Sequence, residues 1–185
     1  MLCITTLIAL ATLAVIPTAA TLARGGRMAA AARDLALTFH ALRWKSVAEN
    51  RSHGLYFEQA DGEWHWYRVR DGNGNGLRTA EVKNGTDPIL SGPHRTRDRV
   101  SGVDPGFPGE GPFPRVRGGG SIDNLDDPVK FGVSNLVSFS PLGASSSGTV
   151  YLTDGRRELF AVVLFGPTVR VRVWRYDPRT GNWRR

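Results

Sequence analysis

Apolar and polar positions divide the chain into three stretches with different periods. Residues 1–23 carry no charged side chain and are mostly apolar; at about 1.5 Å per helical residue they reach about 34 Å, enough to cross a bilayer. Residues 27–50 lack Gly and Pro, and apolar side chains recur there every three or four residues, which predicts an amphipathic helix. Its apolar stripe comprises Met28, Ala31, Leu35, Phe39 and Leu42.

From residue 53 onward, short apolar or alternating runs lie between turn residues and predict β-strands. Residues 55–58 and 64–70 flank Asp61-Gly62, a sequence typical of a hairpin turn. Residues 159–165 are apolar at every position, which predicts a central strand covered on both faces. The last four strands are expected at residues 136–140, 149–153, 158–165 and 169–176; the third of them contains this apolar run.

These patterns predict an α+β fold in which an N-terminal membrane-spanning and amphipathic helix precedes an antiparallel β-sheet head. The expected parts are a transmembrane segment (residues 1–23), an amphipathic helix (24–52) and a β-rich head (53–185), with an irregular Pro/Gly-rich excursion at 84–128. Gly25-Gly26 is expected to be a hinge. The helix is expected to stop between Asn50 and Gly54, where a glycine can take the left-handed cap.

A cleavable signal peptide is the alternative interpretation of residues 1–23. Thr18-x-Ala20 or Thr21-x-Ala23 would then be the cleavage site, although no Lys or Arg precedes the apolar run. The nearest charges, Arg24, Arg27 and Arg33, follow the segment, whereas positive residues usually mark its cytoplasmic side. We favour an uncleaved membrane helix.

Composition argues against an enzyme or a zinc protein. The one cysteine, Cys3, lies in the apolar segment, and the chain has neither a CxxC pair nor HExxH. The four histidines show no ligand spacing. We therefore expect no catalytic residues, no organic cofactor and no small-molecule substrate.

Residues 71–76, Asp-Gly-Asn-Gly-Asn-Gly, resemble the start of a calcium loop. Asp71, Asn73 and Asn75 place oxygen-bearing side chains at positions one, three and five, with a glycine at six. The bidentate acid of such a loop belongs at position twelve, which is Val82, and Glu81 is one residue short. Asp71, Asn73 and Asn75 are therefore weak calcium-ligand candidates, and a tight Gly/Asn turn is the favoured interpretation.

The last twenty residues, which include the last predicted strand, carry most of the net positive charge. The net charge is +7, and residues 166–185 hold six arginines and one aspartate. Valines alternate there with Arg170, Arg172, Trp174 and Tyr176, so that one face is aliphatic and the other combines arginine with aromatic rings. That face suits a phosphate backbone with stacked bases. The favoured alternative is an edge strand whose arginines prevent sheet-to-sheet aggregation.

Several short motifs follow one another in an order that resembles that of a known family. Thr-Leu-Ile-Ala-Leu at residues 6–10 is followed by the amphipathic helix and by a hairpin that ends in the Gly/Asn loop. Residues 137–143 and 148–155 fit the pattern F-S-P-x-G … G-T-x-x-L-x-D-G. This order resembles type IV pilin-like proteins and, more narrowly, the GspH/FimT family of minor pseudopilins. In that family the first motif is Thr-Leu-Ile-Glu-Leu after a basic leader and a glycine, whereas this chain has Ala9 and Ile4 at the Glu and Gly positions.

The resemblance implies a non-enzymatic subunit of a type II secretion pseudopilus or a type IV pilus. It implies a single-pass inner-membrane protein with a periplasmic head, whose N-terminal helix contacts other pilins or pseudopilins. Two alternatives remain: a DNA-binding pilin-like subunit in DNA uptake, and a soluble secreted binding protein with a cleaved signal peptide.

Overall fold

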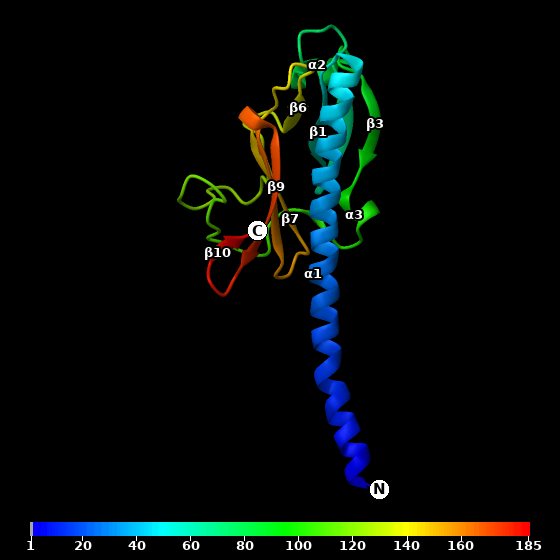
Figure 1. Ribbon diagram of the computed structural model, residues 1–185, viewed down its shortest axis with the longest axis vertical. Helices are drawn as coiled ribbons and strands as arrows, with labels where there is room; N and C mark the ends of the chain where they lie inside the picture. Colours follow the sequence, from blue (N-terminus) through cyan, green and yellow to red (C-terminus); the bar gives the residue numbers. More distant parts are fainter. Residues whose placement is uncertain (1) are drawn as a thin grey trace.

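The α+β class is confirmed by the structure, a computed structural model that describes the backbone of residues 2–185 and the side chains of residues 25–185. One long helix runs the length of the molecule, and a β-rich head lies beside its C-terminal half (Figure 1). In chain order the elements are α1 (Leu2–Glu49), β1 (His53–Ala60), β2 (Glu63–Arg70), α2 (Thr79–Asn84), β3 (Ile89–His94), α3 (Thr96–Arg99), β4 (Asp104–Pro105), β5 (Val129–Lys130), β6 (Leu136–Phe139), β7 (Gly148–Thr153), β8 (Leu159–Phe165), the 3-10 turn η1 (Gly166–Thr168), β9 (Arg170–Asp177) and β10 (Asn182–Arg184).

Helix α1 is a single element of 48 residues. It continues through Gly25-Gly26, so the predicted hinge at these glycines is wrong: both are helical. All five residues of the predicted apolar stripe are buried against the head, as the spacing requires. Among residues 25–185, no helix is long and apolar enough to cross a bilayer. The predicted membrane segment, residues 1–23, lies outside that range.

The helix ends one turn before the predicted glycine cap. Asn50 adopts the left-handed conformation with φ 47°, which Asn tolerates better than most residues, and the Arg51 N–H donates to the Ser46 carbonyl oxygen at 3.2 Å. Gly54 instead lies in β1, where a Cβ atom would come within 2.1 Å of the Val137 carbonyl oxygen. The lack of a side chain at Gly54 lets β1 approach β6 closely, and this glycine does not cap the helix.

The head contains two antiparallel sheets where the sequence predicted one. The first has the order β3-β2-β1-β6, and the second has the order β10-β9-β8-β7-β4, with β5 also paired to β7. The β1–β2 hairpin is confirmed, and Asp61 (φ 52°) and Gly62 (φ 76°) form its two-residue turn. All four predicted C-terminal strands are present, but β6 pairs with β1 and so belongs to the first sheet.

Helix α1 packs across both sheets and joins them in one core. Phe39 lies 5.9 Å from Phe139 of the first sheet and 6.3 Å from Phe131, between ring centroids. The predicted burial of β8 on both faces is confirmed. Its even-numbered residues from 160 to 164 belong to the core under α1, whereas Leu159, Ala161 and Val163 belong to a second core on the opposite face.

The excursion at residues 84–128 is only partly irregular, which corrects the prediction. It contains β3, α3 and β4, and its remaining residues cross the far face of the second sheet. Phe113 and Ile122 are buried there and, with Phe107, help to form the second core. Strand β3 was not predicted because it contains a glycine and a proline. Gly92 is required there, since a Cβ would come within 2.8 Å of the Tyr67 ring.

Candidate nucleic-acid interface

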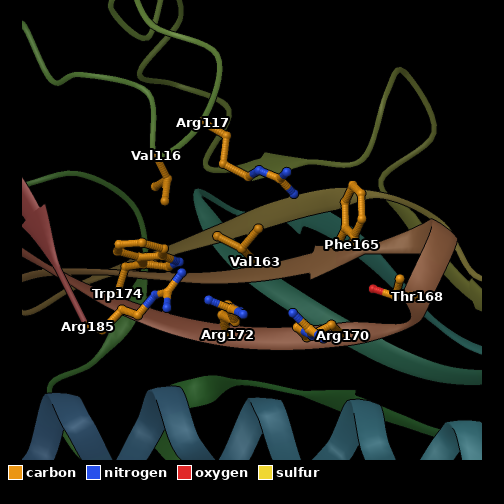
Figure 2. A pocket seen from close by; sticks show the side chains of 9 residues that line it. All are labelled: Val116, Arg117, Val163, Phe165, Thr168, Arg170, Arg172, Trp174 and Arg185. Atoms are coloured by element: carbon orange, nitrogen blue, oxygen red, sulfur yellow. The ribbon is translucent and has the colours of Figure 1, made fainter.

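Strand β9 separates its side chains as the alternation predicts. Val171 and Val173 pack toward the core under α1, whereas Arg170, Arg172 and Trp174 lie on the opposite face of the sheet (Figure 2). β9 pairs with β8 along most of its length, but β10 pairs only with residues 175–177. Residues 170–174 therefore lie at a sheet edge, in agreement with the edge-strand interpretation.

A groove of about 390 Å³ opens over this part of β9, and we call it the arginine groove. Its walls come from β8, η1, β9, the loop after β4 and the C-terminus (Figure 2). The lining residues are Val116, Arg117, Val163, Phe165, Thr168, Arg170, Arg172, Trp174 and Arg185.

Arg117 reaches the groove because the excursion folds back on itself. Residues 113–122 form a narrow loop held by the Arg115 N–H to the Gly120 carbonyl at 2.9 Å and the Ile122 N–H to the Phe113 carbonyl at 2.8 Å. The three glycines 118–120, which follow Arg117, all have positive φ. They make the sharp reversal that brings Arg117 over the sheet.

Two of the four arginines stack on aromatic rings of the groove. The Arg117 guanidinium carbon lies 4.4 Å from the centre of the Phe165 ring. The Arg185 guanidinium carbon lies 4.7 Å from the Trp174 ring. Such cation–π contacts hold long side chains in place while the guanidinium edges stay free to donate hydrogen bonds.

Positive charge in the groove is uncompensated by protein groups. Among residues 25–185, no carboxylate lies within ion-pair distance of Arg117, Arg170, Arg172 or Arg185. Desolvation, followed by the charges of Arg185, Arg170 and Arg117, lowers the pKa of Arg172 from its ordinary value. This mutual repulsion is relieved by a bound anion, so the geometry favours phosphate or another polyanion.

Other aromatic and basic residues of the C-terminal segment do not line the groove. Tyr176 packs in the second core, 5.6 Å from Phe113 and 5.4 Å from Trp183 between ring centroids, and does not line the groove. Arg175 pairs with Glu158 at 3.0 Å, and Arg184 pairs with Asp177 at 2.6 Å. Arg117 and Phe165 were missed by sequence reasoning, because neither lies in the basic strand.

The calcium candidates form a closed loop of internal hydrogen bonds. The buried Asp71 carboxylate accepts backbone N–H groups of Asn73, Gly74 and Gly76 at 2.7–3.2 Å. The side-chain amides of Asn73 and Asn75 both donate to Glu81 at 2.9 Å. This is the hydrogen-bonding pattern of the tight Gly/Asn turn.

A metal site in this loop stays a prediction. Within the part of the chain described with side chains, no group of three or more His, Cys, Asp or Glu residues is arranged to hold a metal ion. The Glu81 carboxylate nevertheless reaches the loop despite falling one position short in the sequence, because α2 folds back over it.

Comparison with known proteins gives no match: no family model, no curated protein and no solved structure matches this chain.

Proposed function

We propose that this chain is a minor pilin-like subunit of a type II secretion pseudopilus or a type IV pilus. The observation that carries the proposal is helix α1. Its C-terminal half forms one wall of the head core, and its N-terminal half continues beyond the head as part of the same helix (Figure 1). An uncharged segment at the end of such a helix suits insertion into a bilayer and into a bundle of like helices.

The outer face of α1 supports contact with neighbouring subunits. Leu37, Trp44 and Val47 are apolar, yet they are 66%, 69% and 51% exposed on the side of the helix away from the head. Large apolar side chains gathered on one exposed face commonly mark a protein interface. In this proposal other pilins or pseudopilins cover them, residues 1–23 lie in the inner membrane, and the head lies in the periplasm.

Mass spectrometry of the chain purified from membranes tests the anchor. We expect the intact mass to include residues 1–23 and the chain to resist extraction with alkaline carbonate. A mature chain that begins at Thr21 or Arg24 would contradict the pilin proposal and favour the secreted binding protein.

Photo-crosslinking tests the subunit contacts. A photoreactive residue at position 44 should give crosslinks to other membrane-anchored subunits in the native envelope. The same residue at position 133 is the matched control, because Val133 is fully exposed on the head. Crosslinks from position 133 alone would contradict the role of α1 in assembly.

Nucleic-acid binding by the head is the second candidate function, and the arginine groove favours it. Arg170, Arg172 and the added Arg117 present guanidinium groups beside Trp174 and Phe165. Contacts of this kind bind the phosphate backbone without reading sequence, and the rings offer stacking surfaces for bases. A pilin-like subunit with this groove would take part in DNA uptake.

A DNA titration at two salt concentrations tests this candidate. We expect a dissociation constant on the order of micromolar or weaker, and binding that weakens steeply as salt rises, because each neutralised phosphate releases a counterion. Arg170→Ala with Arg172→Ala should lower the affinity and leave the melting temperature nearly unchanged. The control is Arg78→Ala with Lys83→Ala, two exposed cations at α2. Salt-independent binding, or equal affinity of both variants, would leave the edge-strand interpretation in place.

A further inference from the structure

The end of the head from which α1 emerges carries a second group of arginines. The turn between β7 and β8, residues 154–158, lies against α1 at the level of Arg27 and Met28. A hollow of about 350 Å³ separates them and is lined by Arg27, Met28, Ser101, Gly102, Val103, Asp154 and Arg156. This end of the head points along α1 toward its N-terminus (Figure 1).

The acidic groups at this turn are already engaged. Asp154 Oδ1 accepts the backbone N–H groups of Arg156, Arg157 and Glu158 at 3.0–3.1 Å. Glu158 accepts two hydrogen bonds from Arg175, at 3.0 and 3.2 Å. These bonds fix the shape of the turn. Arg175 compensates the charge of Glu158, whereas Asp154 is held by neutral N–H groups and keeps its negative charge.

Three guanidinium groups at this end of the head make no ion pair with the residues whose side chains are described. Arg27, Arg156 and Arg157 are exposed, and within residues 25–185 no carboxylate lies within ion-pair distance of any of them. Three arginines on two separate elements, with the one charge of Asp154 among them, therefore give this end of the head a local net charge of +2.

The position of this surface along α1 is defined by the sequence. The uncharged segment ends at Ala23, and Arg27 lies four residues further, about 6 Å along the helix axis. The polar headgroup layer of a bilayer is about 5–7 Å thick on each side of the hydrocarbon. With residues 1–23 in the hydrocarbon, Arg27 and the adjacent turn lie at the depth of the lipid phosphates.

We propose that Arg27, Arg156 and Arg157 bind the phosphate groups of anionic phospholipids and hold the head against the membrane surface. The inference rests on the proposed membrane anchor and adds a lipid-binding surface to it. The partner is the lipid surface. A free phosphate carries negative charge as well, but nothing holds it beside the turn. Lipid phosphates stay beside the turn, because the anchored α1 keeps the turn at their depth.

Hydrogen exchange of the full-length chain in vesicles tests the proposal. The probe is the set of backbone amides of residues 155–159, compared between pure phosphatidylcholine vesicles and vesicles with about one third phosphatidylglycerol. We expect exchange to be at least fivefold slower in the anionic vesicles, because bound lipid restrains opening of the turn. Arg156→Gln with Arg157→Gln should bring the ratio close to one without changing the melting temperature.

The matched control is Arg78→Gln with Lys83→Gln, which removes two exposed charges at α2, at the opposite end of the head (Figure 1). This variant should keep the full ratio. A further sample contains phosphatidylcholine vesicles with glycerol phosphate in solution. Slowed exchange there would identify a free-phosphate site and overturn the lipid surface.

Two failures are distinguishable. If alkaline carbonate removes the chain from the vesicles, the proposed anchor is wrong, and this inference falls with it. If the chain stays in the vesicles and exchange is equal in both lipids, the anchor stands and the lipid-binding surface is overturned.

Discussion

The indole N–H of Trp183 donates a hydrogen bond of 2.8 Å to the carbonyl oxygen of Pro114, which lies 69 residues earlier in the chain. Trp183 belongs to β10, and Pro114 lies at the base of the narrow loop that carries Arg117. The bond joins the C-terminal hairpin to the excursion, so it fixes two walls of the arginine groove relative to each other.

Trp183→Phe should weaken this attachment without emptying the second core. The ring keeps its contacts with Tyr151 and Tyr176, while the Pro114 carbonyl loses its donor, at a cost of about 1 kcal/mol. Urea denaturation measures the loss. Trp44→Phe on the exposed face of α1 is the control and should be neutral; equal effects would show that the hydrogen bond does not stabilise the fold.

The head should fold without residues 1–26. Within the described side chains, the core begins at Met28, so a fragment from Arg27 keeps all of it. We expect this fragment to be soluble and monomeric, with a cooperative thermal transition.

Val162→Asp should abolish that transition, because Val162 is 0% exposed in the core under α1, with Val150 and Val173 as its cross-strand partners, and a buried, unpaired carboxylate costs about 4 kcal/mol or more. Val133→Asp introduces the same charge at a fully exposed site and should be tolerated. A Val162→Asp fragment that melts like its parent would show that β8 is not central.

Two glycine-to-alanine changes should have opposite signs. At Gly54 a Cβ would come within 2.1 Å of the Val137 carbonyl oxygen and 2.7 Å of Leu77, so Gly54→Ala should separate β1 from β6 and cost about 2 kcal/mol or more. Gly26 is helical and a Cβ there meets nothing within 4 Å. In the full-length chain in detergent, Gly26→Ala should therefore stabilise the helix by about 0.5–1 kcal/mol. Thermal melts of both variants decide; a stabilising Gly54→Ala would refute the close approach of the strands.

Stability should fall as pH drops from about 7 to 5. Desolvation lowers the pKa of fully buried His53, against the opposing effect of Glu49 at 2.8 Å, and desolvation also lowers the pKa of His94. Since the unfolded chain takes up protons near pH 6.5 and the folded chain only at lower pH, protonation favours unfolding across this window. Denaturation midpoints at several pH values measure the slope. His53→Gln with His94→Gln should flatten it; an unchanged slope would assign it to other groups.

Local pattern was sufficient for the elements that bury a continuous apolar surface. The stripe on α1 and the seven apolar residues of β8 each have one arrangement that removes them from water, so both were predictable. The alternation of β9 likewise predicted the face on which Arg170, Arg172 and Trp174 lie.

Long-range pairing was not predictable from the same signals. Strand β3 contains a glycine and a proline and becomes a strand because β2 supplies its hydrogen bonds. The place of β6 in the first sheet depends on its pairing with β1, in which Leu55 lies 82 residues before its partner Val137.

 In that register Leu55 lies opposite Val137, a contact that no local pattern encodes. Trp183 also holds the loop that carries Arg117 over the groove, and sequence spacing contains no record of that hydrogen bond.

The unbroken course of α1 also determines where the head faces. The helical residues in the core wall and the N-terminal half belong to one helix. The head therefore tilts together with the helix, and the arginine groove tilts with it. Each helical residue turns the chain by about 100° and advances it by about 1.5 Å. The number of residues between Ala23 and Met28 therefore sets the direction in which the groove faces around the helix axis, as well as its distance from residues 1–23 along that axis.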